Sequence, residues 1–284
     1  MNNKNGIILI DKPKGITSFD VIRLLKKKFG TKKIGHSGVL DKPASGLMIC
    51  AVNRATKLLS IFEEGYKIYI ADIVFGIKTD TLDMQGSIVD TKYTDITKND
   101  LKKVIDSFRG EILQSVPKYS NVRINGKKLY RYALNHESIE LPKRKVTIYD
   151  IELVEFGDNS AKIKVKCSKG TYIRSLAYDI GESLNTFGTI RDLRRIFVYP
   201  FSIDKAKDVD NAEITPINEA LSFLPSISVS KDLVKNVLNG VEFSRIVKCD
   251  KLQNGLYRVL DDNKNFIALI ISEKDKVSYK FVLN

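Results

Sequence analysis

The sequence predicts an α+β fold with a large N-terminal part and a small β-rich C-terminal module. In the large part, strand-like and helix-like segments follow one another without the strict strand–helix alternation of a doubly wound sheet. The length of 284 residues suits one large and one small domain, or two domains of medium size. A boundary falls near Leu224-Pro225, and most segments beyond it are short and strand-like.

The predicted strands of the large part are short apolar or β-branched runs bounded by turn-forming residues. They lie at Ile7–Ile10, Leu47–Val52, Tyr66–Ile77, near Ile88, at Val146–Phe156 and at Ala161–Cys167. The last two runs are close in sequence, and we expect them to pair with each other.

The predicted helices of the large part carry apolar residues three and four positions apart, with a polar residue in front that can cap the helix. They run from Thr17 to Phe29, from Asn53 to Glu64, from Thr97 to Phe108 and from Thr171 to Leu184. Two of them open with a capping-box pattern, at Thr17 and at Thr97, and Asn53 and Thr171 are expected to cap the other two.

The C-terminal module is predicted to hold one short helix at Ser230–Asn239 and several short strands. The strands are expected around Phe243–Val247, Leu256–Leu260, Phe266–Ile271 and Tyr279–Leu283. We therefore expect two domains, residues 1–225 and residues 226–284. The basic, tyrosine-rich segment Lys118–Tyr132 is expected to extend from the larger domain, as an insertion at about 117–135.

Composition indicates a polyanionic partner and gives no sign of a membrane protein. The 47 Lys and Arg residues outnumber the 34 Asp and Glu residues, for a net charge of +13, and such an excess favours nucleic acid as the partner. No apolar run approaches the roughly 18 residues of a membrane helix. The apolar start at Ile7–Ile10 is too short for the core of a signal peptide.

Cysteine and histidine usage argues against a disulfide framework and a metal centre. The three cysteines, Cys50, Cys167 and Cys249, are far apart and form no motif, which is typical of a reducing compartment, and we expect a cytoplasmic location. With two histidines and no metal-binding or nucleotide-binding motif, neither a metal nor a cofactor is expected.

The glycine-rich segment Gly35–Gly46 contains both His36 and Asp41. It can be an ordinary surface loop in which Asp41 serves a turn. Alternatively, it presents a carboxylate on a shaped loop, where glycines let the backbone approach a ligand closely. A second segment, Cys167–Arg174, has the pattern of a strand, a turn and a helix start. This segment can be an ordinary helix start capped by Thr171. Alternatively, it brings Tyr172 and Arg174 to a loop carboxylate, which the arginine keeps ionised and oriented.

Two further features admit both a structural and a functional interpretation. Tyr69, in a predicted strand, is either a core aromatic residue or a ring that stacks on an extruded base. Asp80 and Asp83 form either a carboxylate pair for glycosidase-type chemistry or a Thr-rich turn, and their spacing favours the turn.

The order and spacing of several blocks resemble the TruB family of tRNA pseudouridine synthases. Gly35–Gly46, Lys67–Gly86 and Cys167–Ser175 resemble the three signature blocks of that family; Leu9–Gly15, Tyr119-Ser120, Gly126–Tyr130 and Leu193–Arg195 resemble further blocks. The resemblance extends from residue 6 to about residue 225, and the C-terminal module is similar to a PUA domain. It implies a mixed, largely antiparallel sheet flanked by helices.

The resemblance also implies roles for individual residues. Asp41 matches the nucleophile, Tyr69 the tyrosine that stacks on the target uracil, and Tyr172 and Arg174 the active-site tyrosine and the arginine that pairs with the aspartate. Leu193 matches an apolar residue near the base, and His36 a histidine that contacts the T-loop. Lys12, Tyr119 and Lys127 lie in matching blocks and are expected to bind substrate. The chain departs from the family at Lys42, beside the residue that matches the nucleophile.

The implied reaction is isomerisation of uridine 55 in the T-loop of tRNA, by a protein that needs no obligatory protein partner and is expected to be a monomer. One alternative is a non-catalytic tRNA-binding or tRNA-folding module on the same scaffold. The presence of Asp41, Tyr69, Tyr172 and Arg174 argues against it. A second alternative acts on other RNAs with guide RNA and protein partners, and the compact chain without long basic extensions disfavours it.

Overall fold

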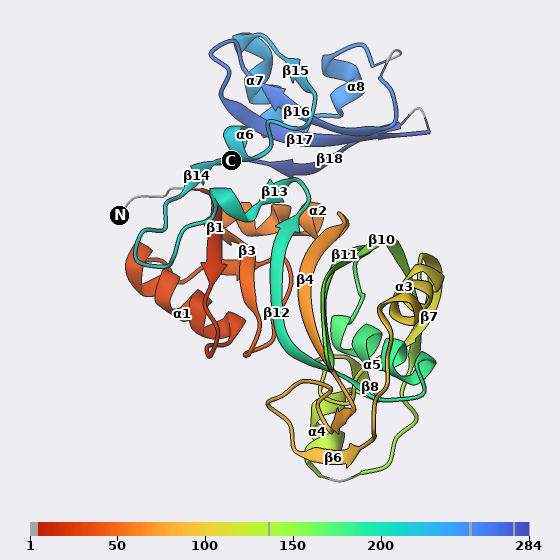
Figure 1. Cartoon of the computed structure of the whole chain (residues 1–284). Coiled ribbons are helices and arrows are strands. Elements are labelled where there is room, and N and C mark those ends of the chain that lie inside the picture. Colours follow the sequence, from red (N-terminus) through yellow and green to blue (C-terminus); the bar gives the residue numbers. More distant parts are fainter. Residues whose placement is uncertain (1–4, 136, 250–251, 275, 284) are drawn as a thin grey trace.

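A ten-stranded mixed sheet forms the body of the protein (Figure 1). The computed structural model describes residues 5–135, 137–249, 252–274 and 276–283. The strands of this sheet are β1 (Gly6–Lys12), β2 (Ile34–His36), β3 (Ser45–Val52), β4 (Lys67–Phe75), β7 (Gly110–Ser115), β10 (Lys143–Gly157), β11 (Ser160–Cys167), β12 (Gly188–Val198), β13 (Phe201–Ser202) and β14 (Thr215–Pro216).

The strand order confirms the predicted mixed, largely antiparallel sheet. The main path is β14-β1-β3-β12-β4-β11-β10-β7, with β2 paired to β3 and β13 paired to β12. The β12–β3 pair is parallel, through Arg194 and Arg195 opposite Ser45 and Gly46, and the other pairs of this sheet are antiparallel. The predicted pairing of the strands now bounded as β10 and β11 is confirmed.

Helices flank both faces of the sheet. On one face lie α1 (Ser18–Phe29), α3 (Lys98–Ser107) and α5 (Ile173–Ser183), whose buried residues share one apolar cluster with the central strands. On the other face lie the short helices η1 (Asn53–Leu58), α2 (Leu59–Glu63) and α6 (Ile217–Ala220). No helix within the described ranges is long and apolar enough to cross a membrane.

Strands β1 and β3 carry the uninterrupted apolar runs Ile7–Ile10 and Leu47–Val52 because both faces of these runs are covered. Ile8 and Met48 point into the cluster under α1, whereas Ile7 and Leu47 point into the cluster on the opposite face. Successive side chains of a strand alternate between the two faces, so a strand that is buried on both sides needs an uninterrupted apolar run. This arrangement anchors the loop between β2 and β3 to the most deeply buried part of the sheet.

The predicted caps are only partly confirmed. Thr17 and Asp20 form the expected capping box of α1, and Gly30 ends that helix in the left-handed conformation. The predicted helix from Asn53 is instead a 3-10 turn followed by α2, and Asn53 has a φ of +54° and does not cap it. Thr171 does not cap α5, because its hydroxyl donates to the carbonyl of Ser168.

The chain after residue 225 forms a second, four-stranded sheet of β15 (Ser226–Ser228), β16 (Gly255–Leu260), β17 (Phe266–Glu273) and β18 (Lys276–Val282). It lies against the end of the body that carries α2 and α6 (Figure 1). Two helices cover it, α7 (Lys231–Leu238) and α8 (Phe243–Ile246). The predicted strand at Phe243–Val247 was therefore wrong. A four-residue run does not reveal its periodicity, and Phe243 packs as a helical residue against Tyr279.

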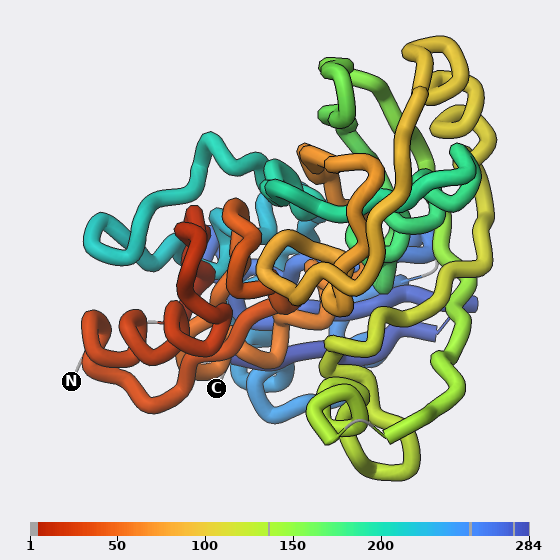
Figure 2. Tube along the Cα trace, turned by 60° about the horizontal axis from the view of Figure 1, so that its bottom comes forward, coloured from red at the N-terminus to blue at the C-terminus, as the bar shows by residue number. Residues whose placement is uncertain are grey.

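The remaining elements are short. They are β5 (Ile77–Thr79), β6 (Ile88–Thr91), β8 (Arg123–Ile124), β9 (Lys127–Lys128), α4 (Leu129–Leu134) and η2 (Ile203–Lys205). The β8–β9 hairpin and α4 make up the basic segment that was predicted to extend from the body. Figure 2 shows this segment in yellow-green, standing away from the main sheet.

Candidate active site

A cavity of about 950 Å³ opens where β3, β4, β12 and α5 come together. Six of the predicted site residues line it: Asp41, Tyr69, Tyr119, Tyr172, Arg174 and Leu193. They come from five separate segments of the chain, so the fold brings together side chains that are up to 152 positions apart (Asp41 and Leu193).

The loop from Ser37 to Ala44, called the Asp41 loop below, is held by hydrogen bonds from the turn and helix start that follow β1. The Ser18 hydroxyl donates to the carbonyl of Leu40 over 2.9 Å and accepts the Leu40 N–H over 2.8 Å. The N–H of Gly15 donates to the carbonyl of Lys42 over 2.9 Å. Although Lys42 differs from the residue typical of the family, the loop is hydrogen-bonded to neighbouring segments on both sides of Asp41, at Leu40 and at Lys42.

Asp41 and Arg174 form the ion pair that the sequence predicted. Arg174 Nε lies 2.9 Å from Asp41 Oδ2; the arginine side chain is 7% exposed and the aspartate side chain 40%. The remaining nitrogens of Arg174 donate to the carbonyls of Thr81, at 2.8 Å, and Tyr119, at 3.1 Å. Since every edge of the guanidinium has a partner, Arg174 is fixed in place and can orient the carboxylate toward the cavity.

Asp80 and Asp83 serve the turn between β5 and β6. Asp83 Oδ1 accepts from the Thr81 hydroxyl and from the Gln85 N–H, and Asp80 Oδ1 accepts from the Ser87 N–H. This supports the turn interpretation over a glycosidase pair. Asp83 also has a second function that the sequence did not indicate. Its Oδ2 lies 3.8 Å from Arg174, so the arginine lies between two carboxylates.

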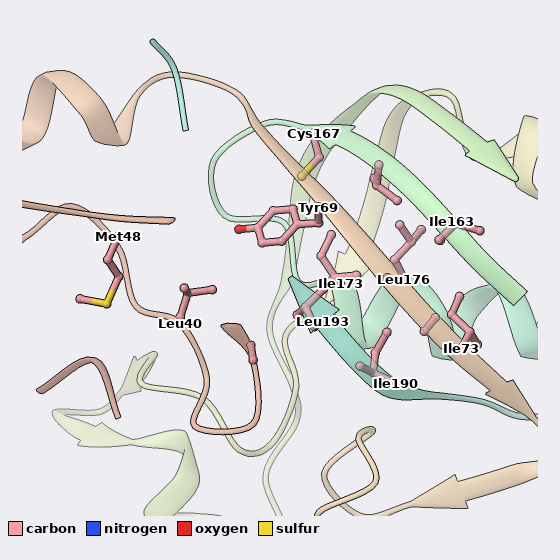
Figure 3. Packing of buried hydrophobic residues seen from close by; sticks show 14 of the residues in the cluster. Leu40, Met48, Tyr69, Ile73, Ile163, Cys167, Ile173, Leu176, Ile190 and Leu193 are labelled. Carbon is pink, nitrogen blue, oxygen red and sulfur yellow. The ribbon is translucent and has the colours of Figure 1, made fainter. Parts of the chain in front are cut away.

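Tyr69 projects from β4 into the apolar wall of the cavity. Figure 3 shows its ring beside Ile173 and Leu193, with the hydroxyl pointing away from its own strand. The residue is 8% exposed, and burial raises the pKa of its phenol. A half-open apolar wall with a flat ring suits the stacking of a planar base. Leu193, also 8% exposed, lies on β12, a strand that the sequence analysis did not assign.

Tyr172 and Tyr119 lie on the opposite side of the cavity. Tyr172 precedes α5, and its N–H donates to Gln114 Oε1 over 2.8 Å; burial raises the pKa of its phenol. Tyr119 donates its hydroxyl to Asp80 Oδ2 over 3.2 Å, while its carbonyl holds Arg174. The start of the basic insertion is therefore joined directly to the Asp41–Arg174 ion pair.

Three predicted substrate-binding residues do not line the cavity. His36 ends β2, and its Nδ1 accepts the Gly38 N–H over 3.2 Å; burial lowers its pKa. Lys127, in the insertion, pairs with Glu137 over 2.5 Å and lies 4.4 Å from the ring centre of Tyr132. Neither His36 nor Lys127 lines the cavity, and a contact of these two residues with RNA stays a prediction.

The structure assigns Lys12 a different place from the one expected. It is 0% exposed, and its ammonium donates to the carbonyls of Pro13 and Ile16, each at 2.9 Å, with that of Lys42 at 3.5 Å. Burial lowers its pKa to about 8, and the nearby charge of Asp41 acts in the opposite direction. A lysine in this position supports the Asp41 loop through the carbonyl of Lys42, and a contact of Lys12 with RNA stays a prediction.

Arg195 is a cavity residue to which the sequence analysis gave no role. It is 3% exposed and lines the cavity next to Tyr69. Its position follows from β12, which places Arg194 and Arg195 on opposite faces of the sheet. Within the described ranges, no group of three or more His, Cys, Asp or Glu side chains is arranged to hold a metal ion.

Known proteins resemble this chain along most of its length. The family model described as TruB family pseudouridylate synthase (N terminal domain) matches residues 26–173. The tRNA pseudouridine synthase B of Clostridium kluyveri is 40% identical over 273 residues, which cover 93% of this chain and 94% of that protein. The protein of the same name from Fusobacterium nucleatum is 49% identical over 199 residues, 70% of this chain and 69% of that one.

Among solved structures, a chain from a Cbf5-Nop10-Gar1 complex has the same fold. The TM-score is 0.73 at 23% identity, over 98% of this chain and 84% of that one. A mixed sheet with an arginine-paired aspartate in a tyrosine-lined cavity is thus the scaffold of a pseudouridylate synthase. The chain belongs to the TruB family of these enzymes and is an isomerase.

Proposed function

We propose that the protein converts uridine to pseudouridine at position 55, in the T-loop of tRNA. The observation that carries the proposal is the Asp41–Arg174 pair at 2.9 Å in a cavity that also presents Tyr69 and Leu193. The curated relatives named above are called tRNA pseudouridine synthase B. The net charge of +13 supplies a general attraction to RNA phosphates.

The reaction requires the target uridine to leave the stack of its loop. Flipping a nucleotide costs a few kcal/mol, and stacking on an aromatic side chain offsets part of that cost. Tyr69 and Leu193 provide such a surface in the cavity. The basic insertion, with its attachment at Tyr119, is well placed to hold the opened loop while the base enters.

Asp41 is the group that promotes cleavage of the bond between ribose C1′ and uracil N1. The uracil then turns and bonds to C1′ through C5; C5 loses its proton and N1 gains one, so that the product is an isomer of the substrate. Arg174 keeps the carboxylate oriented for this step, because its other donors are committed to fixed carbonyls. The chemistry leaves no net oxidation and transfers no group from a second substrate.

We further propose that residues 226–284 form a PUA-like RNA-binding domain, and that residues 1–225 form the catalytic domain, with residues 117–135 as its RNA-binding insertion. The separate four-stranded sheet supports this division. The protein is proposed to act as a monomer, without an obligatory protein partner, in the cytoplasm, where its tRNA substrate is found. A structural neighbour in a multi-protein complex shares the fold at 23% identity, which does not extend its assembly to this chain.

The test is incubation of the purified protein with unmodified tRNA, followed by mapping of pseudouridine by position. Modification at uridine 55, lost in Asp41→Asn while tRNA binding persists, is the expected result. Asp90→Asn, on the exposed strand β6, is the matched control and should retain full turnover. Tight tRNA binding by the wild-type protein without release of tritium from C5-labelled uridine would instead identify a non-catalytic binding module.

A further inference from the structure

Arg195 is a buried cation without an acidic partner in the described part of the chain. Its side chain points into the protein beside the cavity, and the residue is 3% exposed. The ion pairs found in the described ranges join Arg174 to Asp41 and Asp83, and Arg194 to Asp11, but none involves Arg195. Burying a charge without a counter-charge is costly, so its retention needs another source of stabilisation.

Backbone carbonyls from both ends of the Asp41 loop supply that stabilisation. Arg195 Nε donates to the carbonyl of Leu47 over 2.8 Å, after the loop. Its two terminal nitrogens lie 3.5 Å from the carbonyl of Val39 and 3.3 Å from that of Gly38, before Asp41. One guanidinium therefore connects the strand that leaves the loop with the segment that enters it.

The backbone around Arg195 is packed so closely that the side chain has little freedom to shift. Gly46 lies opposite Arg195 in the parallel pair of β3 and β12. A Cβ atom at Gly46 would lie 2.2 Å from the Arg195 carbonyl oxygen, and its φ of +114° is one that favours glycine. The start of the Arg195 side chain is thereby fixed relative to the Asp41 loop.

Arg195 also lies opposite Tyr69 in the antiparallel pair of β12 and β4, and both residues line the cavity. Burial is the main cause that raises the pKa of Tyr69, and Cys167 from β11 and Asp41 from its loop act in the same direction. Arg195 opposes them from its place opposite Tyr69. Its positive charge therefore favours negative charge on the Tyr69 oxygen.

We propose that Arg195 is a positioning residue for the reaction, which fixes the Asp41 loop through three carbonyls and presents a positive charge to the Tyr69 hydroxyl. Asp41 and Tyr69 reach the cavity from different segments. Arg195 bonds to the backbone on both sides of Asp41 and also lies opposite Tyr69. Arg174 orients the carboxylate from one side of the cavity, and Arg195 holds the backbone of the loop from the other.

The decisive variants are Arg195→Gln, which removes the charge, and Arg195→Lys, which keeps the charge but lacks the planar fork. A displacement of about 1 Å near reacting groups can cost about 100-fold in rate, and we expect a loss of kcat of that order for Arg195→Gln with little change in KM. Arg195→Lys should recover only part of the turnover, since it cannot bind all three carbonyls together.

The charge is tested independently of catalysis by fluorine NMR on protein labelled with difluorotyrosine. Its fluorines make the phenol more acidic, so that titration occurs while the protein is folded. The Tyr69 signal is the one missing from Tyr69→Phe, among 12 tyrosines. We expect its titration midpoint to move to higher pH in Arg195→Gln and to stay near the wild-type value in Arg195→Lys.

Arg194→Gln is the matched control, because Arg194 is the neighbouring residue and bonds to Asp11, at 2.6 Å, on the opposite face of the sheet. It should leave both kcat and the Tyr69 midpoint unchanged. An unchanged Tyr69 midpoint in folded Arg195→Gln, or an unchanged kcat, would overturn the proposal. The turnover readout rests on the proposed function; if the wild-type protein made no pseudouridine, that function would fail while the NMR test of Arg195 would still stand.

Discussion

At the scale of single residues, Arg174 holds together the loops that form the cavity. It pairs with Asp41 on one edge, lies near Asp83, and donates to the carbonyls of Thr81 and Tyr119. These partners belong to the Asp41 loop, the β5–β6 turn and the start of the insertion. One guanidinium thus sets the mutual positions of three loops that have no regular hydrogen-bonded pairing with one another.

Arg174→Ala is therefore expected to lower turnover by about 100-fold or more while weakening tRNA binding only modestly, since it misplaces Asp41 without removing an exposed phosphate contact. Single-turnover rates at saturating enzyme, together with filter-binding affinities, measure the two effects separately. Arg191→Ala provides a control, because Arg191 makes an exposed ion pair with Asp72. A variant that lost affinity and kept its single-turnover rate would contradict the orienting role of Arg174.

Lys12 gives a pH-dependent prediction. Its folded-state pKa of about 8 lies below the ordinary value of 10.5, so between these values the folded protein binds fewer protons at Lys12 than the unfolded chain does. The contribution of Lys12 to the free energy of unfolding therefore rises as the pH increases from about 8 to 10.5. We expect the stability difference between wild type and Lys12→Met to shift in favour of wild type from pH 7.5 to pH 9.5, measured by urea denaturation at each pH. A constant difference would show that Lys12 is not buried as a cation.

At the scale of elements, local signals predicted what local interactions determine. Helices α1 and α3 begin at the capping threonines that the sequence indicated. Strands β1 and β3 were found because of their apolar runs, and β11 because its apolar residues alternate with lysines. Strand β12 was missed because four charged residues, at positions 191, 192, 194 and 195, interrupt its pattern. Those charges are accommodated by partners from distant segments, such as Asp72 and Asp11.

In the site, too, the residues carried by local motifs were predicted, whereas those placed by distant segments were not. The Asp41–Arg174 pair and the approach of Tyr69, Tyr172 and Leu193 were predicted through resemblance of motifs, and the structure brings them into one cavity. Arg195 and Asp83 were not predicted as site residues, since their positions depend on the pairing of β12 and on the β5–β6 turn. The burial of Lys12 was not predicted, because a lysine in a turn sequence gives no sign that its ammonium will be enclosed by carbonyls.

The insertion is an element whose contribution to binding can be measured through salt. Lys128 and Arg131 lie on β9 and α4, in the part that stands away from the sheet. If each neutralises one phosphate, replacing both with glutamine should reduce the slope of log K against log salt by about two and weaken binding at low salt. Binding isotherms at four salt concentrations test this, with Lys26→Gln and Lys27→Gln on α1 as the charge-matched control. An unchanged slope would place the RNA elsewhere on the protein.

At the scale of the whole molecule, the two sheets share one apolar cluster. Leu260, Phe266 and Phe281 of the C-terminal sheet belong to the same cluster as Phe62 and Leu221 of the body. Arg258 adds polar contacts across the junction, with hydrogen bonds to Leu224 at 3.0 Å and to Asn218 at 2.7 Å. The C-terminal sheet is therefore packed onto the body as part of its core, and it is not connected by the chain alone.

Truncation after residue 225 is expected to expose this shared cluster. Since burial of apolar area contributes about 25 cal/mol per Å², loss of the covering sheet should lower the thermal midpoint of the remaining chain and increase its binding of a hydrophobic dye. Arg258→Gln, which keeps the sheet but removes the polar junction, should give a smaller decrease. Scanning calorimetry and dye fluorescence on the three proteins make the comparison. Because neither Asp41 nor Arg174 packs in the shared cluster, any truncated protein that stays folded should still form this ion pair and retain slow turnover on tRNA. A truncated chain with the full-length midpoint would mean that the two sheets fold independently, in conflict with the packing of Phe266 and Phe281 against the body.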